Sequence, residues 1–413
     1  MRRVVVTGIG AVTPIGNNIA DYADSLKRGQ SGSASITHFD ASLFKTRFAC
    51  EVKGLKVEDF IDRKESKRMD RFSHFAMIAT AEAIKNSGLD LETIDLDRAG
   101  VIWGSGVGGL QSLENEIIEF ARGNGTPRFN PFLIPRMISD IAAGYISIRY
   151  GFRGTNYSTV SACASSNHAI LNATDQILYG KADVMVTGGS EAAIIPTGVG
   201  GFNAMKALSE RNDDPKTASR PFDKDRDGFV LGEGGGALIL EEYEHAVKRG
   251  APIYAEIIGG GASADAYHIT APHPEGRGAL TVMRTALRDS HLAPESIDYI
   301  NVHGTSTTLG DISEIKAIQT VFGDHAFKMN ISSTKSMTGH LLGAAGAIEA
   351  IACILAIAHD FIPPTINHFT DDPDFDTRLN LTFNEAQHRK INIALSNTFG
   401  FGGHNTSVIF KRV

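Results

Sequence analysis

Residues 156–170 read NYSTVSACASSNHAI, a short β-branched run that changes at Cys163 into a helix-like segment. Residues 329–343, MNISSTKSMTGHLLG, follow the same plan in the second half of the chain and carry His340 after the turn. Two strand-turn-helix units of one design predict a duplicated fold, because internal self-similarity marks repeated structural units. The rest of the sequence is interpreted outward from these two segments.

Three further pairs of segments match in the same order along the two halves. They are VVVTGIGA (4–11) with YAEIIGGGA (254–262), AGVIWGSGVGG (99–109) with DYINVHGTSTTLG (298–310), and ADVMVTGGSE (182–191) with INIALSNTFGFGG (391–403). We therefore expect two halves, residues 1–250 carrying Cys163 and residues 251–413 carrying the second set of turns.

Short β-branched runs alternate with helix-like segments throughout, which is typical of an α/β protein. The predicted strands are 3–7, 100–104, 157–161, 184–188, 254–259, 299–303 and 392–397. The predicted helices are 66–86, 163–179, 277–290, 311–322 and 341–358. The helices after Cys163 and His340 are apolar or small on nearly every face, so each must be covered all round. This predicts a five-layered α-β-α-β-α body.

Composition excludes several classes of protein. The chain has 413 residues, 42% hydrophobic and 21% charged, with a formal net charge of −7 that argues against general nucleic-acid binding. Three scattered cysteines are too few for a disulfide framework and fit a reducing cytoplasm. The apolar stretch 341–359 contains Glu349 at its centre, which favours a core helix over a membrane span.

Three patterns that resemble ligand motifs are interpreted as chance. The G-x-G-x-x-G at 104–109 lacks the ribose-binding acid that should end a second strand. The acidic run 223–227 begins like a calcium loop, but the glutamate that should close the loop falls one residue early, at Glu233. Cys163 with two histidines nominally supplies three zinc ligands, yet nothing in the spacing demands a metal.

Cys163 and two histidines are the candidate reactive groups. Cys163 is expected to begin a helix, where unpaired amides and the helix dipole favour the thiolate. A lone cysteine is more often a buried small hydrophobe, which is the interpretation kept for Cys50 and Cys353. His303 and His340 each close a predicted strand and open a turn, and strand ends are where α/β folds place reactive groups. We therefore predict a site between the halves.

Four segments closely resemble the signatures of β-ketoacyl-acyl-carrier-protein synthases, and the likeness extends over essentially the whole chain. They are VSACASSNHAI (160–170), HGTSTTLGD (303–311), SSTKSMTGHLLGAAGAIE (332–349) and NTFGFGGHN (397–405). The pair of histidines is similar to the Cys-His-His group, whereas initiating enzymes resemble Cys-His-Asn and degradative thiolases Cys-His-Cys. The resemblance implies a thiolase-like fold and an acyltransferase that elongates acyl chains in fatty-acid biosynthesis.

The resemblance also implies a decarboxylative Claisen condensation. Cys163 takes the acyl chain from a carrier protein, and the backbone N–H groups of Cys163 and Phe401 hold the thioester oxyanion. His303 and His340 then hydrogen-bond the enolate formed when malonyl carrier protein loses carbon dioxide. By the same resemblance, Lys335 has an electrostatic role, with Asp311 and Glu314 as its partners. Thr305 and Thr307 contact the pantetheine arm, and Val107 forms the floor of the acyl pocket. Gly400 and Gly402 belong to a loop that acts as a gate.

Val107 is bulky, as in type II enzymes, whereas His404 and Thr308 depart from the residues that many members carry. No cofactor and no catalytic metal are expected, because the phosphopantetheine arm arrives on the carrier protein. A structural Na or K ion, or a hydrogen-bond network, is expected near Asn301, Glu349, Ser396 and Asn397. A homodimer is expected, with the edge strand at 156–161 as its contact. The acidic carrier protein is expected to land on a basic cluster: Arg63, Lys64, Lys67, Arg68, Arg128 and Lys206.

Three alternatives remain open on sequence alone. A polyketide-type ketosynthase would keep the same catalytic residues and differ in substrate. A non-catalytic partner subunit, similar to a chain-length factor, would lack the nucleophile that Cys163 supplies. A cysteine hydrolase would orient one histidine with a carboxylate or amide and admit water. Activity with saturated acyl carriers, and hydrolysis without a malonyl-dependent product, would separate these classes.

Overall fold

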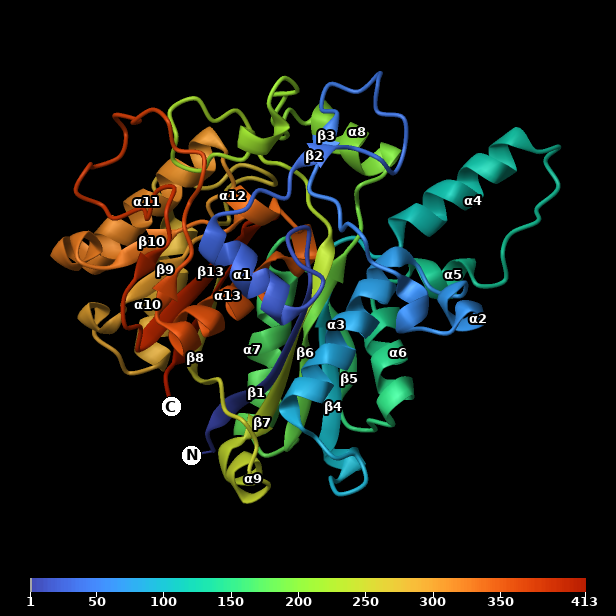
Figure 1. Ribbon diagram of the computed structural model, residues 1–413, viewed down its shortest axis with the longest axis horizontal. Coiled ribbons are helices and arrows are strands. Elements are labelled where there is room, and N and C mark those ends of the chain that lie inside the picture. The colour runs from blue at the N-terminus through green and yellow to red at the C-terminus, as the bar shows by residue number, and fades with distance from the viewer. Residues whose placement is uncertain (1) are drawn as a thin grey trace.

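The computed structural model describes residues 2–413 and contains one large sheet with helices on both faces (Figure 1). Its strands are β1 (Val4–Val12), β4 (Ala99–Gly104), β5 (Asn156–Thr159), β6 (Val184–Glu191), β7 (Gly234–Glu242), β8 (Ala255–Ala264), β9 (Tyr299–Asn301), β10 (Asn330–Ser332), β13 (Ile393–Gly400) and β14 (His404–Lys411). The 10 strands follow the order β10-β9-β13-β14-β8-β1-β7-β6-β4-β5. Read from β1 and from β8 outward, the two halves have the same plan.

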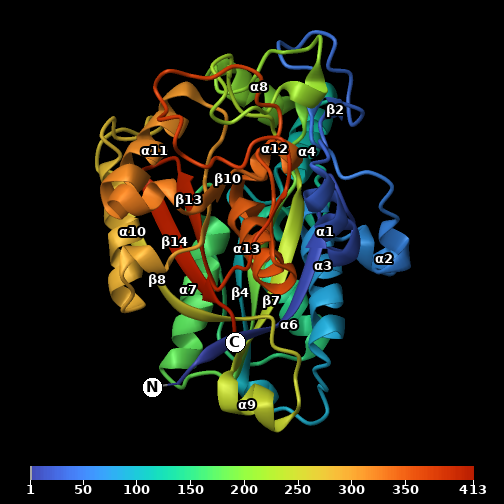
Figure 2. The ribbon, with the colours of Figure 1, turned by 60° about the vertical axis from the view of Figure 1, so that its left-hand side comes forward.

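The helices are α1 (Ile19–Arg28), α2 (Arg63–Ser66), α3 (Arg71–Ser87), α4 (Leu110–Arg122), α5 (Leu133–Met137), α6 (Ile141–Tyr150), α7 (Ser165–Leu178), α8 (Pro196–Ala204), α9 (Tyr243–Lys248), α10 (Arg277–Asp289), α11 (Thr308–Phe322), α12 (Lys335–Thr338) and α13 (Ala345–His359). Figure 2 shows α7 and α13 in the middle of the molecule, with strands on either side. Helices α3 and α6 cover one outer face, and α10 and α11 cover the other. This confirms the predicted α/β fold.

The two half-sheets form one continuous sheet, because β1 and β8 pair with each other. Val4, Val5 and Val6 pair antiparallel with Ile257, Glu256 and Ala255, so hydrogen bonding runs continuously from one half to the other. Two short pairs lie outside this sheet, β2 (Ala34–Ser35) with β3 (Phe48–Ala49) and β11 (Phe361–Ile362) with β12 (Gln387–His388). The five-layered body is therefore built on one strongly bent sheet.

Helix α13 is the most apolar helix of the core. Every residue from Ala345 to Ile357 is buried, including Glu349. The segment Leu342–His359 is long and apolar enough to cross a membrane by composition, but 89% of it is buried inside the protein. It is therefore the covered core helix that its small residues and central carboxylate predict.

The predicted helix 66–86 corresponds to α3, which begins at Arg71, while residue 66 is the end of the separate short helix α2. The side chain of Asp70 ends the connection between them, because it accepts the N–H of Phe72 at the start of α3. Its second oxygen accepts the N–H of Ser112 at 2.9 Å and the hydroxyl of the same residue at 2.6 Å, which ties α3 to α4. A sequence pattern that looks continuously helical does not reveal a cap of this kind.

Candidate active site

Cys163 lies in a tight turn between β5 and α7. Ala162 has φ 52°, in the left-handed region that costs about 1–3 kcal/mol for a non-glycine residue. The Ser165 side chain holds the turn, accepting the N–H of Ser161 at 3.0 Å and donating to the carbonyl of Ala162 at 2.6 Å. Helix α7 begins at Ser165, so Cys163 precedes the helix instead of beginning it.

The turn presents the sulfur to both predicted histidines. The Nε2 of His340 lies 3.0 Å from the Sγ of Cys163. The rings of His303 and His340 have their centroids 5.2 Å apart and are nearly perpendicular, at 86°. The backbone N–H groups of Phe401 and Cys163 are close enough to the sulfur to lower the pKa of the thiol. The structure thus brings together groups from four residues that are far apart in the sequence.

Burial raises the pKa of the Cys163 thiol to about 12. The charge of Lys335 and the two N–H groups act in the opposite direction but do not overcome it. The thiolate predicted from the helix end is therefore wrong for the resting protein. A helix terminus stabilises a nearby charge by roughly 0.3–1 kcal/mol at exposed sites, which is less than the cost of burying a thiolate.

This ionisation state predicts a steep pH dependence for alkylation of Cys163. Because the thiolate is the nucleophile and the pKa is far above neutrality, the rate with iodoacetamide is expected to rise about tenfold per pH unit between pH 7 and 9. Quenched alkylation followed by peptide mass spectrometry measures it. A rate that is flat over this range would show that the cysteine is already ionised.

Both histidines are neutral at pH 7. Burial lowers the pKa of His303 and of His340 well below the usual value, and the positive charge of Lys335 lowers both further. The Nδ1 atom of each ring is buried and has no hydrogen-bond partner among the described residues. With the proton on Nε2, each ring presents one donor to the cavity. Two such donors suit an oxyanion or enolate oxygen.

Two buried carboxylates fix the turn between β9 and α11. Glu314 accepts the N–H of His303 at 2.9 Å and of Gly304 at 2.8 Å, and burial raises its pKa to about 7. Asp311 accepts the N–H of Ser306 at 3.2 Å. Its other oxygen lies 3.4 Å from the guanidinium of Arg226, and burial raises its pKa to about 6. Both carboxylates position the turn that carries His303.

Lys335 pairs with neither of the two carboxylates predicted for it. Its ammonium group forms an ion pair with Glu349 of α13, and both side chains are at most 1% exposed. Burial raises the pKa of Glu349 to about 7, while the adjacent Lys335 lowers it. Glu314 is close enough for the charge of Lys335 to lower its pKa, but Asp311 is held by Arg226. The prediction of Asp311 as a partner of Lys335 is therefore wrong, and Glu314 interacts with Lys335 through its charge without a direct ion pair.

Three of the four residues predicted near a cation carry unpaired buried oxygens. Asn301 Oδ1, Glu349 Oε2 and Ser396 Oγ have no hydrogen-bond partner among the described residues. Asn301 and Ser396 are register partners on β9 and β13, so their side chains share one face of the sheet. The side chain of Asn397 is on the other face, bonded to Ser407 at 2.6 Å and to Glu314 at 3.3 Å. Only its backbone could join the other three.

A cavity of about 530 Å³ opens above the cysteine and histidines. Its lining includes four residues predicted to bind substrate, namely Val107, Thr305, Thr307 and Gly400. It also includes Phe401, predicted to be catalytic, and Lys206, predicted to bind the carrier protein. The hydroxyls of Thr305 and Thr307 lie 3.0 Å apart. The Gly402 backbone, with φ 85°, turns beside the cavity in a conformation that favours glycine. All the predicted substrate residues except Gly402 thus line the cavity that contains Cys163.

The segment 265–273 also borders this cavity and was missed by sequence analysis. Its contacts to the loop 400–403 include Gly402 N–H to Ile269 O at 2.7 Å and Asp265 N–H to Gly403 O at 2.9 Å. Asn405 Nδ2 donates to Asp265 Oδ1 at 2.9 Å. The only available signal was a polar stretch with two prolines after β8, which carries no chemistry of its own.

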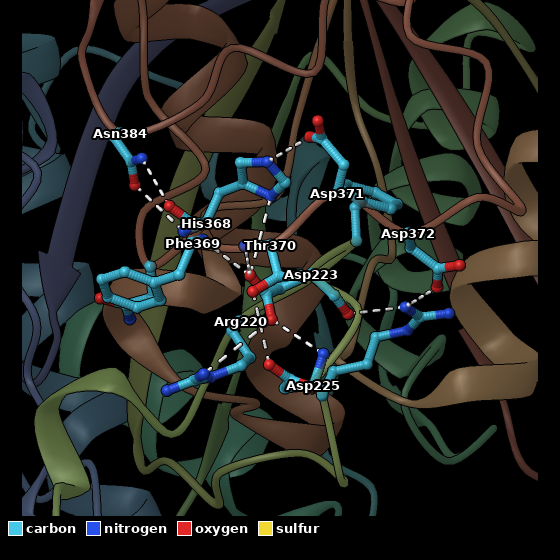
Figure 3. Close-up of polar contacts among 12 residues, drawn as sticks. Arg220, Asp223, Asp225, His368, Phe369, Thr370, Asp371, Asp372 and Asn384 are labelled. Atoms are coloured by element: carbon cyan, nitrogen blue, oxygen red, sulfur yellow. Dashed lines mark hydrogen bonds and ion pairs between the residues drawn. The ribbon is translucent and has the colours of Figure 1, made fainter.

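The acidic run 223–227 is part of a polar network beside the β9–α11 turn (Figure 3). Asp223 accepts the N–H groups of Phe369 at 2.7 Å, Thr370 at 2.8 Å and Asp225 at 2.9 Å. His368 Nε2 lies 2.9 Å from Asp371. The carboxylate of Asp223 therefore accepts hydrogen bonds from backbone N–H groups, whereas a calcium loop would direct its oxygens at the ion.

The predicted basic residues come from three segments of the chain. Lys64, Lys67 and Arg68 are exposed on and just after α2. Arg128 is exposed between α4 and α5. Lys206 lines the cavity after the end of α8. The guanidinium of Arg68 lies over the ring of Phe132, 5.1 Å from its centroid, so α2 and the connection between α4 and α5 are neighbours.

Comparison with known proteins gives a consistent result over the whole chain. The Beta-ketoacyl synthase N-terminal domain model matches residues 1–246, and the corresponding C-terminal domain model matches residues 254–369. The 3-oxoacyl-[acyl-carrier-protein] synthase 2 of Synechocystis sp. is 51% identical over 411 residues, covering 100% of this chain and 98% of the relative.

Solved structures match equally completely. A beta-ketoacyl synthase from Burkholderia phymatum superposes with a TM-score of 0.92 at 37% identity, covering 100% of both chains. A type II PKS ketosynthase in complex with its acyl-carrier protein superposes with a TM-score of 0.91 at 34% identity, covering 100% of this chain and 99% of that one.

Proposed function

The chain belongs to the β-ketoacyl synthase family, and on this basis we propose that it is a 3-oxoacyl-[acyl-carrier-protein] synthase that elongates acyl chains in fatty-acid biosynthesis in the cytoplasm. The observation that carries the proposal is the arrangement of Cys163 with His303 and His340. One sulfur, two neutral imidazoles and two backbone N–H groups face one cavity. That set serves both acyl transfer and decarboxylation.

The first half-reaction transfers the acyl chain to Cys163. A bond forms between Sγ and the thioester carbonyl carbon, the bond to the carrier sulfur breaks, and the thiol proton passes to the departing carrier thiolate. The negative charge on the carbonyl oxygen is stabilised by the N–H groups of Cys163 and Phe401, which act on the neighbouring sulfur. Both donors are fixed by the backbone before substrate arrives.

The second half-reaction forms the carbon-carbon bond. The carboxylate of malonyl carrier protein leaves as carbon dioxide, and its electron pair becomes an enolate whose oxygen accepts hydrogen bonds from the Nε2–H groups of His303 and His340. The enolate carbon attacks the carbonyl carbon of the acyl-enzyme, the bond to Sγ breaks, and the released thiolate takes up one proton from water to regenerate the thiol. Neutral histidines suit this role, since each keeps one N–H to donate.

The proposal is tested by incubating the protein with saturated acyl carrier protein and radiolabelled malonyl carrier protein. We expect a 3-oxoacyl product two carbons longer and one carbon dioxide released per product. Release of free acid without a malonyl-dependent product would instead indicate a hydrolase, and no turnover of either substrate would indicate a non-catalytic subunit.

A polyketide-type ketosynthase is the second candidate, because solved ketosynthases of such systems superpose over the whole chain. The 3-oxoacyl synthase 2 of Synechocystis sp. is more similar in sequence, 51% against 34% and 35%, which favours fatty-acid elongation. Successive extension without reduction of the 3-oxo group would support the polyketide assignment.

We propose an acyl carrier protein as the partner that delivers both substrates. The related ketosynthase solved with an acyl-carrier protein supports this, as does Lys206 at the cavity. Exposed lysines and arginines on α2 and between α4 and α5 suit an acidic partner. Reversing Lys64, Lys67 and Arg68 to glutamate is expected to raise the KM for carrier substrates without changing kcat. An unchanged KM would count against α2 as the docking element.

A homodimer is proposed from the edge of the sheet. Strand β5 is the terminal strand of the sheet order, and Tyr157 and Val160 beside it are 38% and 61% exposed. An exposed edge strand with apolar side chains is a ready template for pairing with another chain. Light scattering is expected to give twice the chain mass, and substitution of Asn156 by proline should lower it. A monomer at micromolar concentration would contradict this proposal.

We propose that a monovalent cation binds at the unpaired oxygens of Asn301, Glu349 and Ser396. Three buried oxygens without donors are costly, and a hard cation satisfies them. Potassium or sodium is expected to raise the melting temperature relative to choline chloride at equal ionic strength, and Ser396→Ala should reduce the increase. Equal melting temperatures in all three salts would favour a plain hydrogen-bond network.

A further inference from the structure

Glu191, the last residue of β6, is a fully buried carboxylate next to the active-site cavity, 0% exposed. A charge in such a position must be hydrogen-bonded to be tolerated. Its oxygens accept the N–H groups of Gly106 at 2.7 Å, Gly343 at 3.0 Å, and Val107 and Gly108 at 3.2 Å each, and the Ser105 hydroxyl at 3.1 Å. None of the groups in the proposed reaction uses this carboxylate.

The five donors belong to two segments with different tasks. Residues 105–108 carry Val107 into the cavity lining, and Gly343 follows His340 by three residues. A Cβ at Gly343 would lie 2.1 Å from the backbone nitrogen of Gly106 and 2.7 Å from Glu191 Oε2. The two segments are therefore in contact with no room for a side chain, and the carboxylate bonds both.

The charge of Glu191 also reaches the nucleophile. It raises the pKa of the Cys163 thiol beyond the effect of burial, against the lowering by Lys335. Burial raises the pKa of Glu191 itself, while its four backbone donors lower it. A change at Glu191 therefore has two separate consequences, one geometric at the segment 105–108 and one electrostatic at Cys163.

Resting on the proposed condensing function, we propose that Glu191 is a positioning residue that fixes the segment 105–108 against the His340 segment and thereby sets which acyl chain lengths Cys163 accepts. The hydrogen bonds to residues 106–108 determine where the Val107 side chain meets the acyl chain. The bond to Gly343 ties that position to His340. The length of cavity between sulfur and Val107 is then fixed by one carboxylate.

The test is Glu191→Gln, which preserves shape but removes the charge and turns an NH₂ group toward backbone N–H donors. Acylation of Cys163 is measured with a panel of saturated acyl carrier proteins from six to sixteen carbons. The ratio of kcat/KM between the longest and shortest accepted chains is expected to change by about tenfold or more, because ångström-scale shifts change reactivity by up to about 10²-fold. The alkylation rate of Cys163 at pH 8 is expected to rise, since the thiol loses a neighbouring negative charge.

Glu51→Gln is the matched control. Glu51 is also a buried carboxylate, 3% exposed, and accepts the N–H groups of Thr37 at 2.8 Å and His38 at 3.1 Å, but it does not line the cavity. It is expected to cost stability without changing chain-length selectivity or alkylation. Should Glu191→Gln fail to fold, Ser105→Ala removes one donor to the same carboxylate and is expected to shift the ratio in the same direction, about threefold.

A folded Glu191→Gln variant whose ratio stays within twofold of the wild type would overturn the proposal, as would an equal shift in the Glu51→Gln control. If Ser105→Ala is the variant measured, an unchanged ratio of kcat/KM values would likewise overturn the proposal. Failure of the proposed function looks different, since the wild type would then acylate with no member of the panel. In that event the alkylation rate still reports whether Glu191 acts on Cys163.

Discussion

Replacement of Cys163 with glutamine is expected to lower condensation by about 10⁴-fold or more, while decarboxylation of malonyl carrier protein continues. The variant has no nucleophile. Its side-chain carbonyl can accept from the N–H groups of Phe401 and Cys163, where the acylated thioester oxygen would lie. His303 and His340 remain in place to bind the enolate. Labelled carbon dioxide and 3-oxoacyl product are measured in the same reaction.

Cys353→Ala is the control for loss of a buried sulfur. Cys353 lies within α13 with its sulfur 3.9 Å from the carbonyl of Leu395, in the inner core and outside the cavity lining. Condensation by this variant is expected to stay within twofold of the wild type after correction for folded protein. Normal condensation by the Cys163 variant would return that residue to a structural role.

Removal of either histidine is expected to suppress decarboxylation. In the Cys163→Gln background, His340→Ala and His303→Ala should each lower carbon dioxide release by about 10²–10³-fold, the usual effect of deleting one oxyanion donor. The glutamine background separates this step from acyl transfer, so the loss cannot arise from failed acylation. Release of labelled carbon dioxide from malonyl carrier protein measures it.

His325→Ala supplies the matched control. This half-buried histidine contacts the carbonyl of Ile297 through Nε2 at 2.8 Å, away from the cavity. Its loss should cost some stability and leave decarboxylation within twofold. Decarboxylation that survives removal of both His303 and His340 would mean that other donors bind the enolate.

The sequence predicted the α/β fold and the groups that meet around Cys163. The repeated strand-turn-helix pattern located His340 opposite the cysteine turn, and the turn after the predicted strand 299–303 located His303. Local pattern suffices for Cys163 and His303, which follow β5 and β9 directly. The prediction that His340 closes a strand is wrong, because His340 follows the short helix α12, eight residues after β10 ends. The resemblance added Phe401, whose role rests on a backbone N–H that no side-chain pattern could indicate.

The ionisation of Cys163 could not be predicted from the sequence, because it depends on burial more than on position along the chain. The sequence places the cysteine near a helix terminus, which favours the thiolate. In the folded protein Cys163 is only 7% exposed, and the cost of burying the thiolate is the largest effect on the pKa of the thiol. A sequence pattern contains the first effect and not the second.

The partner of Lys335 was equally hidden. Asp311 and Glu314 are acidic neighbours of the catalytic motifs, whereas Glu349 lies 14 residues after Lys335, inside an apolar helix. Only the fold shows that α13 brings this carboxylate back to α12. Arg226, which holds Asp311, comes from a loop that carried a different motif in the sequence.

Strands β7 and β14 were missed because their first residues do not look like strands. Strand β7 begins with three glycines, which ordinarily weaken a strand. A Cβ at Gly236 would lie 3.1 Å from the backbone of Ala347, so the close approach of α13 favours glycine there. Strand β14 begins with polar residues. One of them, Ser407, is buried, and its hydroxyl donates to Asn397 Oδ1 at 2.6 Å.

The central claim is that Cys163 carries the acyl chain, and intact-protein mass spectrometry with peptide mapping tests it most directly. After incubation with an acyl carrier protein and no malonyl substrate, we expect one added acyl group per chain, located on the peptide that contains Cys163 and released by subsequent malonyl carrier protein. An unmodified Cys163, or an acyl group on Cys50 or Cys353 instead, would contradict the account.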